Sequence, residues 1–215
     1  MLICAIVGLA LGGAGNIDIS EALLQAVEAR YGQPARVRVV GWGDLIRADR
    51  SATDLSDEQK MIHANDFFNQ VEWLTDLEHW GQEDYWATPV ETLATNGGDC
   101  EDFSIGKYFS LLETQIDPEK LRITYVKSLT YNQAHMVLVY YPTPDAEPLV
   151  LDNINKTILP ASQRKDLVPV YSFSGESIWL ARERGRKLDA NSMVSLPQWK
   201  NVNERFLNEM RKAKE

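Results

Sequence analysis

Residues 97–129 read GGDCEDFSIGKYFSLLETQIDPEKLRITYVKSL, and here the chain changes from a helical pattern to a strand pattern. After Asp99, a good N-cap residue, apolar side chains recur at helical spacing and predict a helix that begins at Cys100. Gly106 lies inside this helix, where glycine lowers helical stability, so we expect it to permit close packing. Residues 122–129 are rich in β-branched and apolar side chains, which predicts a strand.

The flanking sequence extends both patterns. Further strands are predicted over 134–141, 148–153 and around 168–173 and 177–183, and the first two flank the turn PTPDAE as an antiparallel hairpin. Helical patterns occur over 19–31, over 41–50, from Ser56 onward and over 196–211. Ser20 is a candidate N-cap for the first helix, and Ser56 has capping-box spacing with Gln59. We therefore expect an α+β fold, with a helical N-terminal part packed on an antiparallel sheet.

The composition is that of an acidic folded protein. Its 215 residues are 44% hydrophobic and 25% charged, which is sufficient for a real core. The formal net charge of -9 argues against a general nucleic-acid binder, and no apolar run of about 20 residues interrupts the main body.

The first residues, MLICAIVGLALGGAGN, differ from the rest because they are apolar and uncharged. Their length suits a signal-peptide core better than a membrane span. We expect 1–16 to be a leader rather than a buried strand or helix. The remainder, 17–215, is then a single exported domain with a helical part over about 17–115 and a sheet part over about 120–180.

Cys100 raises an electrostatic question. Removal of the leader would take Cys4 away and leave Cys100 as the single cysteine, either a reactive thiol or half of an intermolecular bridge. Three carboxylates, Asp99, Glu101 and Asp102, flank it, and negative charge opposes the thiolate that a nucleophile needs. Either the thiol is inert, or a positive group belongs beside it.

His135 is the best candidate for a general base, because it opens an apolar strand that would hold it rigidly. A hairpin turn centred between Thr143 and Pro144 places Asp152 opposite His135 on the same face, with Asn153 as the competitor.

The sequence thus predicts a nucleophile, base and orienting acid at Cys100, His135 and Asp152. The partial positive charge of a helix N-terminus and a protonated imidazole would both favour the thiolate. The sequence suggests no partner for His63, and His79 lies in a loop rich in aromatic residues.

Two segments carry a family resemblance, DYWATPVETLATNGGDCEDFSIGKYFSLL (84–112) and LRITYVKSLTYNQAHMVLVYYPTPDAEPLVLDN (121–153). With the Cys–His–Asp order, they closely resemble the bacterial transglutaminase-like cysteine proteinases from about Phe67 to Leu159. The resemblance implies a papain-like/transglutaminase-like cysteine protease fold and a catalytic triad on the three residues already identified.

The resemblance also implies a bound Ca²⁺ next to the nucleophile, and the acidic motif of the family matches Asp99, Glu101 and Asp102. It implies a periplasmic endopeptidase that cuts a large surface adhesin near its N-terminus at paired small residues and so promotes biofilm dispersal. An inner-membrane receptor for cyclic-di-GMP is the implied inhibitor.

Calcium would resolve the question of charge around Cys100. Ca²⁺ accepts several carboxylate oxygens and reverses the local field, whereas Mg²⁺ demands compact octahedral geometry. The competing interpretation is that the acids only cap the helix and complement its dipole. For the reaction, we expect the backbone N–H of Cys100 to act as an oxyanion donor. The Trp86 side chain is a candidate for the second donor or for the substrate cleft.

Two other functions remain open at this level. The same triad could support a transglutaminase or another amide-forming acyltransferase, in which an amine replaces water. The chain could also be a non-catalytic calcium-binding interaction module.

Overall fold

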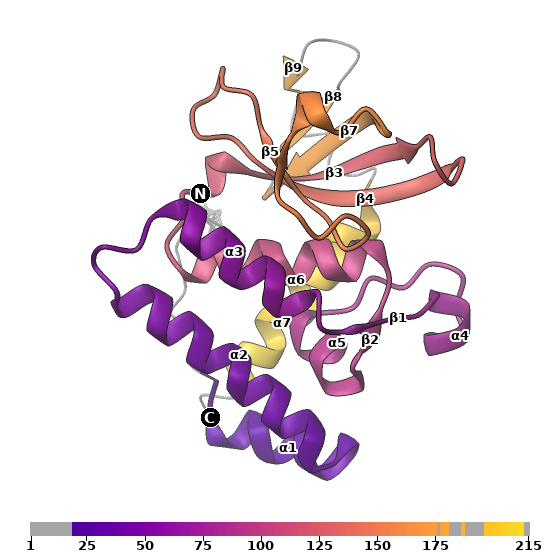
Figure 1. Cartoon of the computed structure of the whole chain (residues 1–215). Helices are drawn as coiled ribbons and strands as arrows, with labels where there is room; N and C mark the ends of the chain where they lie inside the picture. The colour runs from indigo at the N-terminus through magenta and orange to yellow at the C-terminus, as the bar shows by residue number, and fades with distance from the viewer. Residues whose placement is uncertain (1–18, 176, 181–185, 188–195, 213–215) are drawn as a thin grey trace, which may run out of the picture.

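The computed structural model describes residues 19–175, 177–180, 186–187 and 196–212, so the expected leader lies outside the described residues. Helices form one layer and a sheet covers it (Figure 1). The helices are α1 (Glu21–Tyr31), α2 (Gln33–Ser51), α3 (Asp57–Phe68), α4 (Asp76–Trp80), α5 (Pro89–Thr95), α6 (Cys100–Glu113) and α7 (Pro197–Lys212). The strands are β1 (Glu72–Trp73), β2 (Gly97–Gly98), β3 (Leu121–Ser128), β4 (Gln133–Tyr140), β5 (Leu149–Leu151), β6 (Leu159–Pro160), β7 (Leu167–Ser174), β8 (Ser177–Leu180) and β9 (Arg186–Lys187).

The main sheet has the order β6-β5-β4-β3-β7-β8-β9, and neighbouring strands run antiparallel. The small pair β1–β2 is parallel and lies apart from it. The α+β expectation is confirmed. The helices expected over 19–31 and 196–211 correspond to α1 and α7, and the strands expected in the sheet part correspond to β3, β4, β5, β7 and β8.

The helix predicted over 41–50 is much longer than expected. Helix α2 begins at Gln33, directly after α1, because Gly32 has a φ of 85° and turns the chain between the two helices. Pro34 then occupies the first turn of α2, where its missing N–H is not needed. Neither start signal was recognised from the sequence.

The register of the β4–β5 hairpin also differs from the prediction. Tyr140 pairs with Leu149 and Leu138 with Leu151, so the turn is centred one residue later than expected and the register shifts by two. A shift of two keeps side chains on the same face. Asp152, just beyond the end of β5, is therefore a diagonal neighbour of His135 instead of lying directly opposite.

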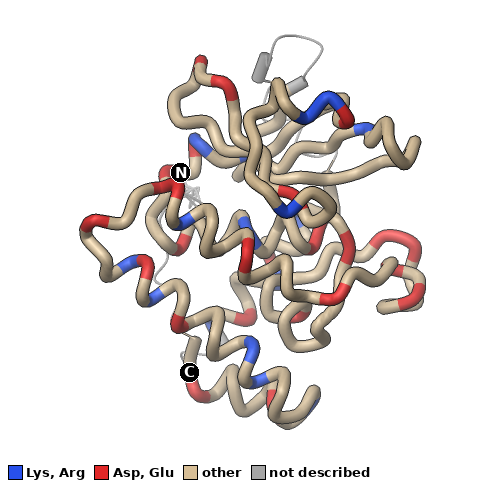
Figure 2. The backbone as a smooth tube through the Cα atoms, in the orientation of Figure 1, with Lys and Arg blue, Asp and Glu red and all other residues tan. Residues whose placement is uncertain are grey.

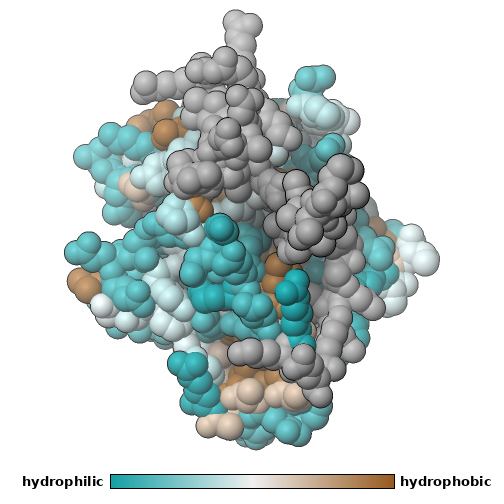
Figure 3. All heavy atoms as spheres, turned by 180° about the vertical axis from the view of Figure 1, so that it is seen from behind, coloured by the Kyte–Doolittle hydropathy of each residue, from teal (hydrophilic) through white to brown (hydrophobic). Residues whose placement is uncertain are grey.

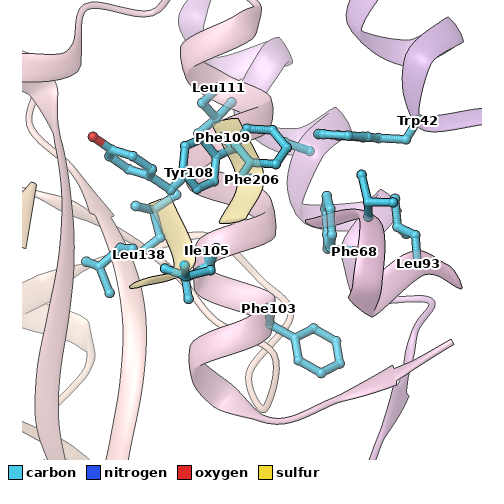
Figure 4. Packing of buried hydrophobic residues seen from close by; sticks show 14 of the residues in the cluster. Trp42, Phe68, Leu93, Phe103, Ile105, Tyr108, Phe109, Leu111, Leu138 and Phe206 are labelled. Carbon is cyan, nitrogen blue, oxygen red and sulfur yellow. The ribbon is translucent and has the colours of Figure 1, made fainter. Parts of the chain in front are cut away.

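Helix α6 is central to the core and is buried along most of its length. Its side chains pack against the sheet through residues such as Leu138, and aromatic residues of α2, α3 and α7 surround it (Figure 4). The ring centroids of Phe109 and Phe206 are 4.4 Å apart. Gly106 does permit close packing, because a Cβ at this position would lie 2.1 Å from the Phe68 ring.

Among the described helices, none is long and apolar enough to cross a bilayer. From behind, the surface that the described residues form is mainly hydrophilic, with small hydrophobic areas between (Figure 3).

Candidate active site

Cys100 is the first residue of α6, and Asp99 is its N-cap residue, as predicted. The Asp102 carboxylate accepts a hydrogen bond from the backbone N–H of Asp99 at 3.2 Å and so closes the first turn. The Cys100 thiol donates to Glu101 at 3.0 Å. Burial, followed by the charges of Glu101 and Asp99, raises the pKa of this thiol well above its ordinary value. The acids alone therefore stabilise the protonated thiol.

His135 and Asp152 are in direct contact. His135 Nε2 donates to Asp152 Oδ1 at 2.8 Å, and both side chains are almost fully buried. The other carboxylate oxygen of Asp152 accepts from Arg164 Nη2 at 2.6 Å. Burial alone would raise the pKa of Asp152, but the bonds from His135, Ile154 and Arg164 and the nearby charge hold it below its ordinary value. Asp152 rather than Asn153 thus holds the imidazole.

Arg164 was not identified from the sequence, because it lies twelve residues beyond Asp152 and belongs to no recognised motif. It is buried and also donates to Asp166, at 3.0 Å from Nε and 2.8 Å from Nη2. It keeps Asp152 ionised and fixed in position.

Cys100 and His135 lie on elements that pack against each other, α6 and β4. The backbone N–H of Met136, the residue after His135, interacts with the Cys100 thiol and opposes the rise in its pKa. Within the part of the chain that the structure describes, the thiol is bonded to Glu101 and not to the imidazole. The structure thus brings His135 and Asp152 together and sets Cys100 against the same strand.

The predicted metal ligands belong to a larger acidic cluster. Ligand atoms lie within 4.8 Å of one another in three combinations, which are Asp99–Cys100–Glu101, Asp76–Asp84–Glu101 and Asp76–Asp99–Asp102. Asp76 and Asp84 come from α4 and the loop after it, where acidic residues gather at one side of the molecule (Figure 2). They were missed because they precede Cys100 by many residues, so no local spacing indicates the site.

Burial and mutual repulsion raise the pKa values of carboxyl groups in this cluster. Burial, and then the charge of Glu101, raises the pKa of Asp99 to about 8. Burial is also the main reason why the pKa of Asp76 rises to about 6 and why that of Asp102 lies well above its ordinary value. One oxygen each of Asp76 and Asp99 is buried without a hydrogen-bond partner. These two oxygens are suited to a cation.

Backbone and side-chain donors hold the cluster in place. Asp76 accepts from the Tyr85 N–H at 2.6 Å, and Asp102 accepts from the Ala87 N–H at 2.7 Å. Trp86 Nε1 donates to Asp84 at 2.9 Å, and its ring stacks on Phe173. The indole N–H of Trp86 is thus bonded within the cluster, and its role as an oxyanion donor or cleft residue stays a prediction.

The other two histidines have structural partners. His63, for which the sequence suggested no partner, lies 2.8 Å from Asp49, and His79 lies 2.8 Å from Thr95. Neither belongs to the candidate site.

A family comparison covers most of this region. The model of the bacterial transglutaminase-like cysteine proteinases (BTLCP) matches residues 46–179. The chain belongs to this family. The matched range includes Cys100, His135, Asp152 and the whole acidic cluster.

Solved structures agree with this assignment. EGTA-treated LapG of Legionella pneumophila matches with a TM-score of 0.75 at 42% sequence identity, over 86% of this chain and 96% of that one. Calcium-bound LapG of the same organism gives a TM-score of 0.73 at 42% identity, over 87% and 99% of the two chains. The expected transglutaminase-like fold of the LapG type is confirmed for this bacterial transglutaminase-like cysteine proteinase. No curated protein sequence matches significantly.

Proposed function

We propose that the chain is a calcium-dependent cysteine endopeptidase with Cys100 as nucleophile, His135 as base and Asp152 as orienting acid. The observation that carries this proposal is the buried His135–Asp152 pair, held 2.8 Å apart at the start of β4. The backbone N–H of Met136, the next residue of the strand, contacts the Cys100 thiol at the start of α6. A nucleophile and an oriented base on two rigid elements are the requirement for covalent acyl transfer.

In this mechanism His135 takes the proton of the Cys100 thiol, and the sulfur attacks the scissile carbonyl carbon. His135 then gives this proton to the departing amine. A water molecule, deprotonated by His135, then hydrolyses the thioester and frees the thiol. Because Nε2 of His135 is bonded to Asp152, Nδ1 is the ring nitrogen left for these proton transfers. The backbone N–H of Cys100 at the helix start is suited to bind the oxyanion. The indole N–H of Trp86, the candidate second donor, would have to leave Asp84 to take part.

The acidic cluster fits calcium. Asp76, Asp84, Asp99, Glu101 and Asp102 offer oxygen ligands from a loop and a helix start, and two of these oxygens are buried without a partner. The calcium-bound state of LapG, a relative at 42% identity, supports the same assignment here. A bound Ca²⁺ would supply positive charge that offsets the carboxylates beside the Cys100 thiol.

We further propose a periplasmic location and a large surface adhesin as the substrate, cut near its N-terminus at paired small residues to release cells from a biofilm. An inner-membrane receptor for cyclic-di-GMP is the proposed inhibitor. The family resemblance and the similarity to LapG support these assignments.

The test is cleavage of an N-terminal adhesin fragment that contains paired small residues. The full-length chain is assayed with calcium, after addition of EGTA and after calcium is restored, with Cys100→Ala as the blank. We expect cleavage that EGTA abolishes and calcium restores. Asp84→Asn should raise the calcium concentration for half-maximal activity at least tenfold, whereas Asp54→Asn, an exposed control, should leave it unchanged.

The other outcomes separate the alternatives. Cleavage that survives EGTA would contradict the calcium requirement, and cleavage by Cys100→Ala would contradict the nucleophile. Incorporation of an added amine in place of hydrolysis would favour a transglutaminase. Calcium-dependent binding of the fragment without turnover would favour an interaction module.

A further inference from the structure

The face of the sheet turned away from α6 carries a groove with a volume of about 570 Å³. Strand residues alternate between the two faces, so Ile123 and Leu138 contact the main core, while Val126, Val137 and Val139 form a second apolar cluster. These valines line the groove, and the volume lies in the range of small-molecule sites. The groove is therefore separate from the cluster of acids around Cys100.

One guanidinium in the groove is fixed in position by aromatic rings. Arg122 lies between Tyr141 and Trp179, with its central carbon 4.3 and 4.2 Å from the two ring centroids. Its Nε is buried and has no hydrogen-bond partner. A buried N–H without an acceptor costs free energy that a bound oxygen would recover.

A second guanidinium lines the same groove. Arg164 is 4% exposed, and its Nε and Nη2 bond to acids, but its Nη1 is buried without a partner. The groove thus has two arginines with free donors, one acidic residue, Asp145, and an apolar floor.

We propose that this groove binds a small organic carboxylate whose apolar chain lies over the valines and whose carboxylate pairs with Arg122, with Arg164 as the second donor. A guanidinium matches the geometry of a carboxylate, and the valine floor matches an aliphatic chain. The lining belongs to a sheet face rather than to an edge strand, which disfavours an added peptide strand as the occupant. The groove shares one residue with the proposed catalytic site, since Arg164 also bonds to Asp152.

The test is a titration of the calcium-supplemented full-length chain with sodium octanoate, followed by methyl NMR. We expect saturable shifts centred on the methyl groups of Val126, Val137, Val139 and Val150. Octanol and acetate, which lack the charge and the chain respectively, should not produce these shifts at equal concentration. Arg122→Gln should weaken octanoate binding at least tenfold, whereas Arg47→Gln, an exposed arginine on α2, should not.

Several results would overturn the proposal. These are shifts that scatter over the surface or do not saturate, acetate or inorganic phosphate that binds as tightly as octanoate, and unchanged affinity in Arg122→Gln. Should Arg122→Gln fail to fold, the comparison of octanoate with octanol and acetate on the unaltered chain decides alone.

Discussion

At the scale of single residues, Gly106 determines how closely α6 approaches α3. Any side chain at this position would overlap the Phe68 ring, which is fully buried and also contacts Trp42. Because the interior is densely packed, neither ring has room to move away. The position of α6, and with it Cys100, thus depends on the absence of a single methyl group.

We expect Gly106→Ala to lower the free energy of unfolding by about 3 kcal/mol, since the added Cβ overpacks the core. Gly41→Ala in α2 is the matched control, because a Cβ there would lie 3.7 Å from Phe67, an ordinary contact. The control should be neutral or more stable by up to about 1 kcal/mol, as alanine favours a helix. Urea denaturation of both variants measures the difference, and equal stabilities would contradict this account.

Single residues also show how far sequence reasoning reaches. His135 and Asp152 were identified because a strand and a turn restrict where their side chains point, and the contact between them is present. Asp76, Asp84 and Arg164 were not identified, because tertiary packing brings them to the site from distant segments. Local patterns contain no information about such convergence.

At the scale of elements, the helix and strand types were predictable, but their exact lengths and pairing were not. The periodicity of α3 and its capping box gave its start correctly. The hairpin register was wrong by two residues because the conformation of the turn between β4 and β5 sets it, and several turns fit the same sequence. The even shift preserved the contact between His135 and Asp152.

Helix α7 carries a carboxyl group with a strongly shifted pKa. Burial, and then the charge of Glu91, raises the pKa of Glu209 from the ordinary 4.5 to about 8. The folded state therefore favours the protonated form. This contribution to stability is complete below pH 4.5 and is lost as the pH rises through 8.

Glu209→Gln, which imitates the protonated form, should thus be more stable than the unaltered chain at pH 9, with little difference at pH 4. Glu204→Gln, an exposed change on the same helix, is the control and should show no such trend. Urea denaturation at a series of pH values is the measurement. A constant difference between Glu209→Gln and the unaltered chain would count against a buried, protonated Glu209.

At the scale of the whole molecule, the C-terminal helix connects to the acidic loop far from it in sequence. Arg205 of α7 donates to the Tyr85 hydroxyl at 2.8 Å and also bonds to Glu91 and to the backbone carbonyl of Trp86. Gln198 donates to Asp84 at 2.7 Å. Helix α7 therefore supports the loop that supplies part of the proposed calcium site.

Arg205→Gln should weaken calcium binding about tenfold, because the loop around Asp84 loses its support while every acidic ligand remains. Arg211→Gln, an exposed change near the end of the same helix, should bind calcium normally. Isothermal titration calorimetry measures the calcium affinity of both variants. An unchanged affinity in Arg205→Gln would mean that the loop holds its shape without α7.

Because α7 supports the loop around Asp84, the order of synthesis determines when the proposed calcium site is complete. Ribosomes synthesise a chain from its N-terminus, so Cys100, His135 and Asp152 are complete long before Arg205 and Gln198 exist. A nascent chain still lacks the helix that braces the loop around Asp84. Under the proposed function, the calcium site and full activity would therefore form only after the C-terminal helix has been synthesised and has packed against this loop.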